Sequence, residues 1–437
     1  MARGRHGAGL TTRGQAFLGA GLTLIAAGVL LGLRDFTRFG VLIAGLPVLA
    51  LLLDRRPIDL EVTRTVAPAS VAVGDTALVQ VTFRHKGQRS TPLLLVSEQF
   101  PQECGPAPRA ALGSLAPGGA RAIRYAVSPP LRGRLPLGPS TVVVRDPFGL
   151  TTRHLPIGRH DDLLVVPRTW PLEPVRAHRA AAGGEGDQLF VIAARGDEDQ
   201  TVREYRDGDD RRRIHWPATA RTGDLMVRHE DRPGRRRAVV LLDTRASVFG
   251  GGGGVSSRFE WALSCATSIA LHLLSEGYAV TLVTAAGTIG GLDPESDADA
   301  ILGHGATVMP TSHATLPLAT AQARSLVGAA AVMVAVVGET HADGGADLAD
   351  IRELLAVRPT GGDARAVVVT STASSESSRR SRRSTRLGTE LPSGASSPTE
   401  ALLIQAGWAT FVASPSDGIP EAWLALTRRR GHAQERP

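Results

Sequence analysis

The sequence contains few of the residues that carry most metal, redox and base-stacking chemistry. Its 437 residues include only two cysteines, Cys104 and Cys265. We assign them to different domains, which argues against a structural disulfide, and they cannot form a usual zinc site without several well-placed histidines. Aromatic residues make up 4% of the chain, too few for a platform on which single-stranded nucleic acid would stack. A reducing compartment fits this composition.

Charge is unbalanced but not concentrated. The chain has 49 Lys and Arg residues against 42 Asp and Glu residues, a net charge of +7, and nearly all of the basic residues are arginine. These arginines are scattered along the chain and do not form one basic stripe. Together with the shortage of aromatics, this scatter predicts that nucleic acid is not a partner.

Two common catalytic loops are also missing. The glycine run 250–254 lacks the Gly-Lys-Ser/Thr ending of a phosphate-binding loop. No serine in a turn-and-glycine context accompanies His215, so the sequence offers no activated nucleophile. We therefore expect a protein that is not an enzyme.

The length predicts several domains, since one hydrophobic core rarely serves more than about 100–200 residues. A hydrophobic share of 43% supplies enough apolar material for them. We expect a transmembrane helical hairpin with a basic N-terminus over 1–57, a β-sandwich over 58–168, a charged segment over 169–237, and an α/β domain over 238–437.

Two apolar runs near the N-terminus predict the hairpin. Gln15 to Leu33 carries no charge and is about the ~20 residues that cross a bilayer core. Phe39 to Leu53 is short for a span, and it crosses if the helix starts near Phe36. A cleaved signal peptide fits poorly because a second apolar run follows at once. The arginines at the outer ends of the hairpin outnumber Arg34 and Arg38 in its turn, which predicts a multi-pass protein of the cell membrane with its soluble domains in the cytoplasm. The outer arginines are Arg3, Arg5, Arg13, Arg55 and Arg56.

Residues 58–168 have the pattern of short strands. Segments such as Ala77–Phe83 and Thr141–Val144 are rich in β-branched residues, and turn signals such as Asp146-Pro147-Phe148-Gly149 separate them. Regular short strands with such punctuation predict a β-sandwich of immunoglobulin-like size.

The last part of the chain alternates apolar strands with amphipathic helices, which predicts a mostly parallel, doubly wound sheet. One stretch interrupts this pattern: residues near 371–397 are dense in Ser and Arg, and we predict a disordered insertion there. The predicted strands are Ala238–Leu242, Ala279–Thr284, Ala331–Val337, Ala366–Thr370 and Ala409–Val412, and the predicted helices are Arg258–Glu276, Asp347–Leu355, Thr399–Ala406 and Glu421–Arg428.

The densest polar segment runs from residue 202 to residue 228. Its arginines and carboxylates suit bidentate pairing, which favours a structural or partner-binding ion-pair network. The alternative interpretation makes His215 and a nearby acid an acid–base pair. The candidate signature or partner-binding residues are Arg203, Glu204, Tyr205, Arg206, Gly208, Asp209, Asp210, Arg213, His215, Trp216 and Arg221.

A second polar signal follows the strand that ends at Leu242. Ligands bind at the carboxyl ends of strands in open α/β sheets, so Asp243 and Ser247 stand where a site is expected. Their oxygen atoms suit Mg²⁺, a hard ion that keeps several of its waters. The alternative is a capping turn that leads into the next helix, and no cofactor is then needed.

The segment 203–228 closely resembles the signature of the bacterial family known as domain of unknown function 58 (DUF58). A typical version of that signature reads R-E-Y-x-x-G-D-D-x-R-x-I-H-W, followed by S/T-A-R, a glycine and L-x-V-R/K, and this sequence matches nearly all of it. The layout is also similar: a membrane hairpin, a β-rich segment that ends near residues 146–150, the signature, and a von Willebrand A-like domain.

The resemblance implies an adaptor that works with a MoxR-type AAA+ ATPase. It also supplies an ion-site template, D-x-S-x-S, in which Asp243 and Ser247 match the first and last positions. Arg245 replaces the middle serine, and its charge disfavours a cation unless the side chain turns away. Thr307 or Thr311 would supply a threonine, and Gly338-Glu339 lies where an aspartate is often found.

These observations favour a membrane-anchored, non-catalytic adaptor or protein-binding protein that acts with such an ATPase in envelope-related assembly. The alternatives are a hydrolase centred on the charged signature and a structural protein of the envelope. The sequence does not identify the partner or the oligomeric state.

Overall fold

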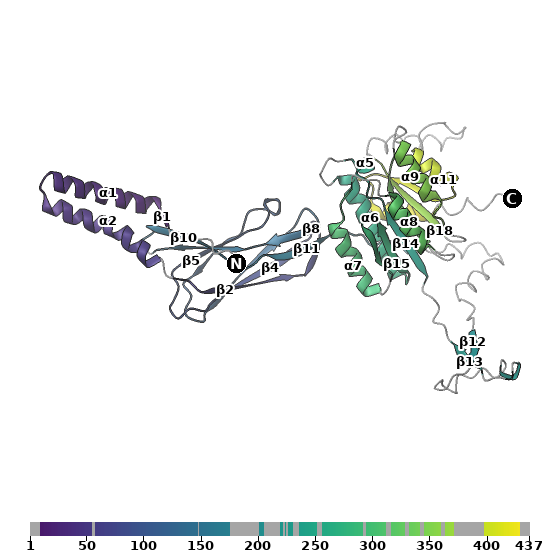
Figure 1. The fold of residues 1–437 in the computed structure, drawn as a ribbon, viewed down its shortest axis with the longest axis horizontal. Coiled ribbons are helices and arrows are strands. Elements are labelled where there is room, and N and C mark those ends of the chain that lie inside the picture. Colours follow the sequence, from purple (N-terminus) through teal and green to yellow (C-terminus); the bar gives the residue numbers. More distant parts are fainter. Residues whose placement is uncertain are drawn as a thin grey trace. The chain divides into compact units, whose positions relative to one another are not determined.

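The computed structural model of the chain (Figure 1) is described here for residues 9–54, 57–146, 148–174, 201–204, 219–221, 223, 226–229, 236–250, 256–291, 294–311, 316–327, 332–340, 345–359, 363–370 and 397–428. The chain divides into two compact units, of which the first comprises residues 1–168 and the second nearly all of the later residues. The insertion predicted near 371–397 lies outside the described residues, except for Ser397.

Near its start the first unit has two long apolar helices, α1 (Thr12–Leu30) and α2 (Arg34–Asp54). The two helices pack so closely that a Cβ atom on Gly21 would lie 2.5 Å from the backbone nitrogen of Ala44. Small residues let membrane helices approach in this way. α2 begins at Arg34 and is 21 residues long, so the second helix is not shorter than the first. By length and composition both helices are able to cross a membrane.

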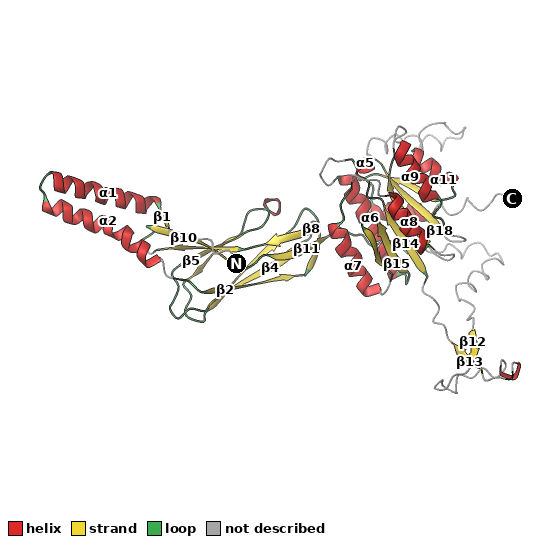
Figure 2. Ribbon diagram, in the orientation of Figure 1, coloured by secondary structure: helices red, strands yellow, loops and turns green. Residues whose placement is uncertain are grey.

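Three sheets follow and share one hydrophobic core (Figure 2). Their strands alternate buried and exposed residues; in β4, for example, Val79, Val81 and Phe83 are buried, whereas Leu78 is exposed. This alternation is the pattern of a sheet that packs one face on a core. The sheets are β1-β10-β9-β5-β6, β3-β11-β8 and β2-β4-β7, with β1 (Gly9–Leu10), β2 (Leu60–Ala67), β3 (Ser70–Ala72), β4 (Ala77–His85), β5 (Leu94–Glu98), β6 (Arg109–Gly113), β7 (Ala120–Val127), β8 (Gly133–Leu137), β9 (Ser140–Arg145), β10 (Thr151–Ile157) and β11 (Asp161–Val166).

A buried ion pair connects these sheets. Arg64 of β2 lies 2.7 Å from the Glu98 carboxylate of β5 and 2.6 Å from the Asp161 carboxylate of β11, and its side chain is 1% exposed. The hydroxyls of Ser140 and Tyr125 also donate hydrogen bonds to Glu98. Burial, with a further contribution from Glu98, raises the pKa of Tyr125, which keeps its phenol a hydrogen-bond donor. We call Arg64, Glu98, Ser140, Tyr125 and Asp161 the sandwich cluster.

The helices are attached to the first sheet through the residue that precedes α1. β1 pairs with β10, and the next residue, Thr11, donates from its backbone N–H to the Leu150 carbonyl at 2.9 Å and from Oγ1 to the Gly149 carbonyl at 2.6 Å. Its Oγ1 also caps α1 by accepting from Gly14 N at 3.2 Å. A Cβ atom on Gly14 would lie 2.2 Å from the Leu150 carbonyl oxygen, so this position requires glycine.

The second unit is built on a six-stranded sheet in the order β16-β15-β14-β17-β18-β19. β14, β15, β17, β18 and β19 pair in parallel, and β16 is antiparallel at one edge. The strands are β14 (Arg237–Leu242), β15 (Ala279–Thr284), β16 (Gly287–Gly290), β17 (Val332–Gly338), β18 (Asp363–Val369) and β19 (Ala409–Ala413).

Helices cover both faces of this sheet, because both faces of its strands are apolar. Val240 and Leu242 of β14 pack in one core with α6 and α12, while Val239 and Leu241 pack in the other with α8, α9 and α11. A sheet buried on both faces produces continuous apolar strands rather than alternation. The helices are α5 (Ala246–Phe249), α6 (Ser257–Ser275), α7 (Pro294–Thr307), α8 (Leu316–Leu326), α9 (Gly345–Leu355), α11 (Pro398–Gln405) and α12 (Ile419–Arg428).

Two short strands, β12 (Thr201–Glu204) and β13 (Met226–His229), pair with each other in an antiparallel ribbon. Both cysteines are free, and they fall in different units. Burial raises the pKa of Cys265 to about 12, so its thiol stays protonated at neutral pH.

Candidate functional site

The candidate site lies where β14 and β17 end, next to each other, at the carboxyl edge of the sheet. β14 is central: the chain runs from it to β15 and β16 on one side and then crosses over to β17 on the other side. Such a switch of direction opens a crevice at the strand ends, which is where open α/β sheets bind ligands. Asp243 follows β14 directly, and its backbone N–H donates to the Val336 carbonyl of β17 at 2.9 Å.

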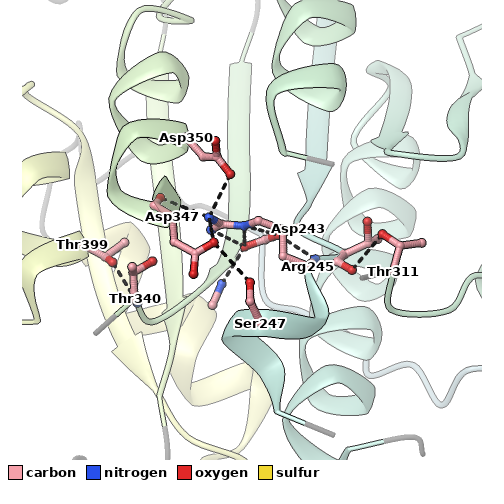
Figure 3. Close-up of polar contacts among 10 residues, drawn as sticks. Asp243, Arg245, Ser247, Thr311, Thr340, Asp347, Asp350 and Thr399 are labelled. Carbon is pink, nitrogen blue, oxygen red and sulfur yellow. Dashed lines mark hydrogen bonds and ion pairs between the residues drawn. The ribbon is translucent and has the colours of Figure 1, made fainter. Parts of the chain in front are cut away.

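The guanidinium of Arg245 turns back onto the carboxylate of Asp243. Its Nη2 lies 2.9 Å from Oδ2 and its Nε 3.0 Å from Oδ1, a two-point pairing (Figure 3). The Asp243 carboxylate also accepts from the backbone N–H groups of Arg245 and Gly338 at 3.0 and 3.3 Å. Asp243 is fully buried and Arg245 is 2% exposed, so this charged pair is held inside the unit.

The rest of the guanidinium faces the first turns of α9. Its Nη1 donates to the Asp347 carbonyl at 3.1 Å and lies 3.3 Å from the Asp347 carboxylate and 3.4 Å from that of Asp350. Ser247 donates from Oγ to the Asp347 carboxylate at 3.1 Å. Asp347 is 27% exposed and Ser247 is exposed, so one side of the arrangement meets the surface. We call Asp243, Arg245, Ser247, Asp347 and Asp350 the edge cluster (Figure 3).

Three carboxylates surround one guanidinium in the edge cluster. Burial alone would lower the pKa of Arg245, but Asp243, Asp347 and Asp350 outweigh it and raise that pKa above its ordinary value. Burial raises the pKa of Asp350 more than the nearby Arg245 lowers it. Arg245 is therefore a permanent positive charge, and it does not fully compensate the negative charge of Asp350.

The edge cluster does not fit a divalent cation. Arg245 binds both oxygens of the Asp243 carboxylate, which would have to be a first ligand, and Ser247 is engaged with Asp347. The Arg245 side chain therefore turns toward the position that a metal ion would occupy. In this geometry its positive charge opposes the binding of a divalent cation. Within the described ranges, no three His, Cys, Asp or Glu side chains form a group suited to hold a metal ion.

The structure also places the residues that would fill the later positions of the ion-site template. Thr311 pairs with Arg245 through the backbone and donates from Oγ1 to the Thr244 carbonyl at 3.4 Å, and Thr307 is the last residue of α7. The carboxylate of Glu339 accepts a hydrogen bond from the hydroxyl of Thr370. Thr311 thus lies beside Arg245, whereas Glu339 is held by the end of β18.

Most of the charged signature falls outside the described residues. Arg203 and Glu204 belong to β12, where they pair in register with Val227 and Met226 of β13, and Arg221 is exposed. The structure does not test the acid–base interpretation of His215. The remaining signature positions, which lie outside the described ranges, are Tyr205, Arg206, Gly208, Asp209, Asp210, Arg213, His215 and Trp216.

Asp347 and Asp350 are members of the edge cluster that sequence reasoning did not select. The sequence predicts the helix that carries them but assigns them no role. Their spacing of three places both on one side of a helix. Their position just after β17 brings that side to the carboxyl edge of the sheet. These two signals together would have identified them.

Comparison with known protein families finds one match. Residues 201–375 match the family described as protein of unknown function DUF58. The matched range contains the charged signature, the edge cluster and the strands from β12 to β18. It supports the DUF58 family for this chain. No curated protein matches the sequence.

Several solved structures resemble parts of the chain. A CARDB domain from Pyrococcus furiosus, solved with di-metal ions, is 20% identical, covers 25% of this chain and 89% of its own, and gives a TM-score of 0.19. The ApaA protein from Bordetella pertussis is 19% identical, covers 26% of this chain and 98% of its own, and gives 0.19 as well. TM-scores this low support no conclusion about fold or function.

Proposed function

We propose that this protein is a membrane-anchored, non-catalytic adaptor whose second unit binds another protein at the edge cluster without a divalent cation. The observation that carries the proposal is the position of Arg245. A guanidinium fills the place at the sheet's carboxyl edge where a cation would bridge to a partner, and it leaves Ser247 and Asp347 at the surface. Such a polar edge suits recognition of a protein surface with complementary charge.

The second unit would be a von Willebrand A-like domain in this proposal. A mostly parallel sheet, helices on both faces, and Asp243 and Ser247 at the first and last positions of D-x-S-x-S support that assignment. The DUF58 resemblance suggests the partner, a MoxR-type AAA+ ATPase, and a role in envelope-related assembly.

The membrane anchor would be the hairpin of α1 and α2. Their large apolar side chains point outward; Leu22 and Leu42, for example, are 55% and 66% exposed. A core helix of a soluble protein would bury these groups, whereas lipid tails cover them at no cost. Both ends of the hairpin carry arginines in the sequence, which favours two spans with both soluble units in the cytoplasm.

The first test is affinity purification of the full chain from native membranes, tagged at the C-terminus and analysed by mass spectrometry. We expect a AAA+ ATPase to be recovered with the wild type and lost with Ser247→Arg, which adds charge and bulk to the exposed side of the edge cluster. Ser325→Arg is the matched control, because Ser325 is an exposed serine of α8 whose hydroxyl also donates one hydrogen bond.

Three results would contradict parts of this proposal. Equal recovery with Ser247→Arg and Ser325→Arg would place the partner elsewhere on the chain. Recovery of extracytoplasmic envelope proteins alone would reverse the orientation and favour the structural role. A hydrolytic activity that His215→Ala abolishes while the protein stays folded would favour the enzyme.

A further inference from the structure

The loop between β9 and β10 holds an aromatic side chain in solvent. Phe148 is 72% exposed, the most exposed large apolar residue outside α1, α2 and the turn between them within the described ranges. Burial of an aromatic side chain stabilises cores and interfaces more than that of most other residues. Phe148 would therefore gain stability if an apolar environment covered its side chain.

The loop is built to keep Phe148 in place. The Asp146 carboxylate accepts from the backbone N–H of Phe148 at 3.0 Å and from that of Thr151 at 2.6 Å. The N–H of Gly149 donates to the Asp146 carbonyl at 3.0 Å, and Gly149 has the positive φ of 69° that glycine adopts readily. The exposure of Phe148 thus follows from a hydrogen-bonded turn.

The same loop is attached to the start of α1. The carbonyls of Gly149 and Leu150 both accept hydrogen bonds from Thr11, the N-cap of α1. Phe148 is therefore next in sequence to Gly149, which accepts a hydrogen bond from the N-cap residue of α1. Two exposed arginines lie close in sequence to the segments that meet here. Arg13 is in the first turn of α1, and Arg145 is the last residue of β9, just before the loop.

We propose that Phe148 inserts into the interfacial layer of the bilayer that α1 and α2 cross, with Arg13 and Arg145 at the level of anionic headgroups. This inference rests on the membrane hairpin proposed above. Membrane-surface segments bury Phe, Trp and Leu side chains at the boundary between headgroups and acyl chains, and arginines near the surface attract anionic lipid. The loop would then fix the first sheet to the membrane surface beside the hairpin.

The test places an environment-sensitive nitrobenzoxadiazole label at single cysteines. The full chain, with Cys104→Ala and Cys265→Ala, is reconstituted in vesicles of phosphatidylcholine and phosphatidylglycerol that carry spin-labelled lipid at a shallow or a deep position. Phe148→Cys reports the loop, and Leu42→Cys reports the hairpin. Leu131→Cys is the matched control, because Leu131 is 58% exposed and precedes β8, so that β8 and β9 separate it from the loop.

We expect the label at 148 to be quenched by the shallow lipid at least about twofold more than the label at 131, since interfacial groups lie about 5–10 Å into the headgroup boundary. The label at 42 should be quenched most by the deep lipid. If 148 behaves like 131 while 42 is quenched, this inference is wrong and the hairpin stands. If 42 is not quenched, the proposed membrane hairpin itself fails.

A protein partner would give a different result at the same position. A label at 148 that neither lipid nor aqueous iodide quenches is covered by protein, which would also overturn the inference. Circular dichroism of each labelled variant checks that the fold is retained.

Discussion

The two units each bury an arginine against a fully buried carboxylate, but they place the pair differently. In the sandwich cluster, Arg64 pairs with Glu98 among strands of three sheets, and hydroxyls from two further strands complete the shell. In the edge cluster, Arg245 pairs with Asp243 at the end of a sheet, and its remaining partners, Asp347 and Asp350, are partly exposed.

The difference fits the proposed roles, in which the sandwich cluster is structural and the edge cluster recognises a partner. A buried ion pair contributes little net stability compared with apolar residues, yet the loss of one partner is strongly destabilising because a charge is left alone. In the sandwich cluster the central pair, Arg64 and Glu98, is enclosed and connects elements within its own unit, and only Asp161 is half-exposed. The edge cluster also reaches the surface at Ser247 and Asp347, so the same chemistry there is accessible to another molecule.

The largest expected effect comes from Glu98→Ala, which leaves Arg64 buried without its main partner. We expect a loss of about 3–5 kcal/mol in the free energy of unfolding of the first unit. All five tryptophans lie at or beyond residue 170, so their fluorescence follows the second unit while circular dichroism follows both. Urea unfolding in detergent should therefore shift only the transition that fluorescence does not report.

Glu61→Ala is the control for that experiment. It removes the partner of Lys86 in a surface pair whose side chains are 48% and 53% exposed, and it should cost less than about 1 kcal/mol. Equal losses for Glu98→Ala and Glu61→Ala would show that the sandwich cluster is not a structural connection.

Asp243→Ala should have the next largest effect, this time on the second unit. The loss should be about 2–3 kcal/mol. It should be less than for Glu98 because two carboxylates, Asp347 and Asp350, still face Arg245, whereas only the half-exposed Asp161 still faces Arg64. The tryptophan transition reports it. The double variant Asp243→Ala with Arg245→Met should recover most of the loss, and a double variant as unstable as the single one would mean that packing, not charge, holds this edge.

Arg245→Ser sharpens the comparison by removing the internal cation. Asp243, Asp347 and Ser247 would then suit Mg²⁺, which keeps several waters and need not touch all three. We expect the variant to gain about 1.4 kcal/mol of stability when Mg²⁺ is ten times its Kd, and the wild type to gain nothing. Thermal unfolding with Mg²⁺ and with EDTA measures both, and an equal Mg²⁺ effect on the wild type would contradict the proposed role of Arg245.

The smallest effect is expected from Asp350→Asn and concerns pH. Burial raises the pKa of Asp350 above its ordinary 3.8 in the folded state. The folded state therefore holds a proton that the unfolded state has lost, so this carboxyl contributes less stability as pH rises through that window. The stability of Asp350→Asn relative to the wild type should increase as the pH rises above about 4, and a flat difference would show that Arg245 compensates Asp350 fully.

The sequence predicts several strands in both units; Ala77–Phe83 and Thr141–Val144, for example, correspond to β4 and β9 to within two residues at each end. Apolar strands and helical periodicity indicate β14, β15 and α6 to within a residue or so at each end. β16 is missed because its four residues, Gly-Thr-Ile-Gly, are too few and too rich in glycine to show a period. α7 and α8 are missed because small and polar residues interrupt their apolar positions.

The sites divide in the same way. The position of Asp243 after an apolar strand predicts the carboxyl edge, because the position depends on local order in the chain. Whether Arg245 turns inward depends on Asp347 and Asp350, which are about a hundred residues away. The pairing of Arg64 with Glu98 depends on how sheets pack, and no local pattern in one sequence carries that information.

In the proposed membrane hairpin, Thr11 has a consequence for how force would pass from α1 to the first sheet. It is the only residue between β1 and α1, and its N–H and its hydroxyl are both bound to the loop before β10. A swivel needs several free backbone torsions in series, and this link supplies almost none. A tilt of α1 would therefore rotate the first sheet together with the helix.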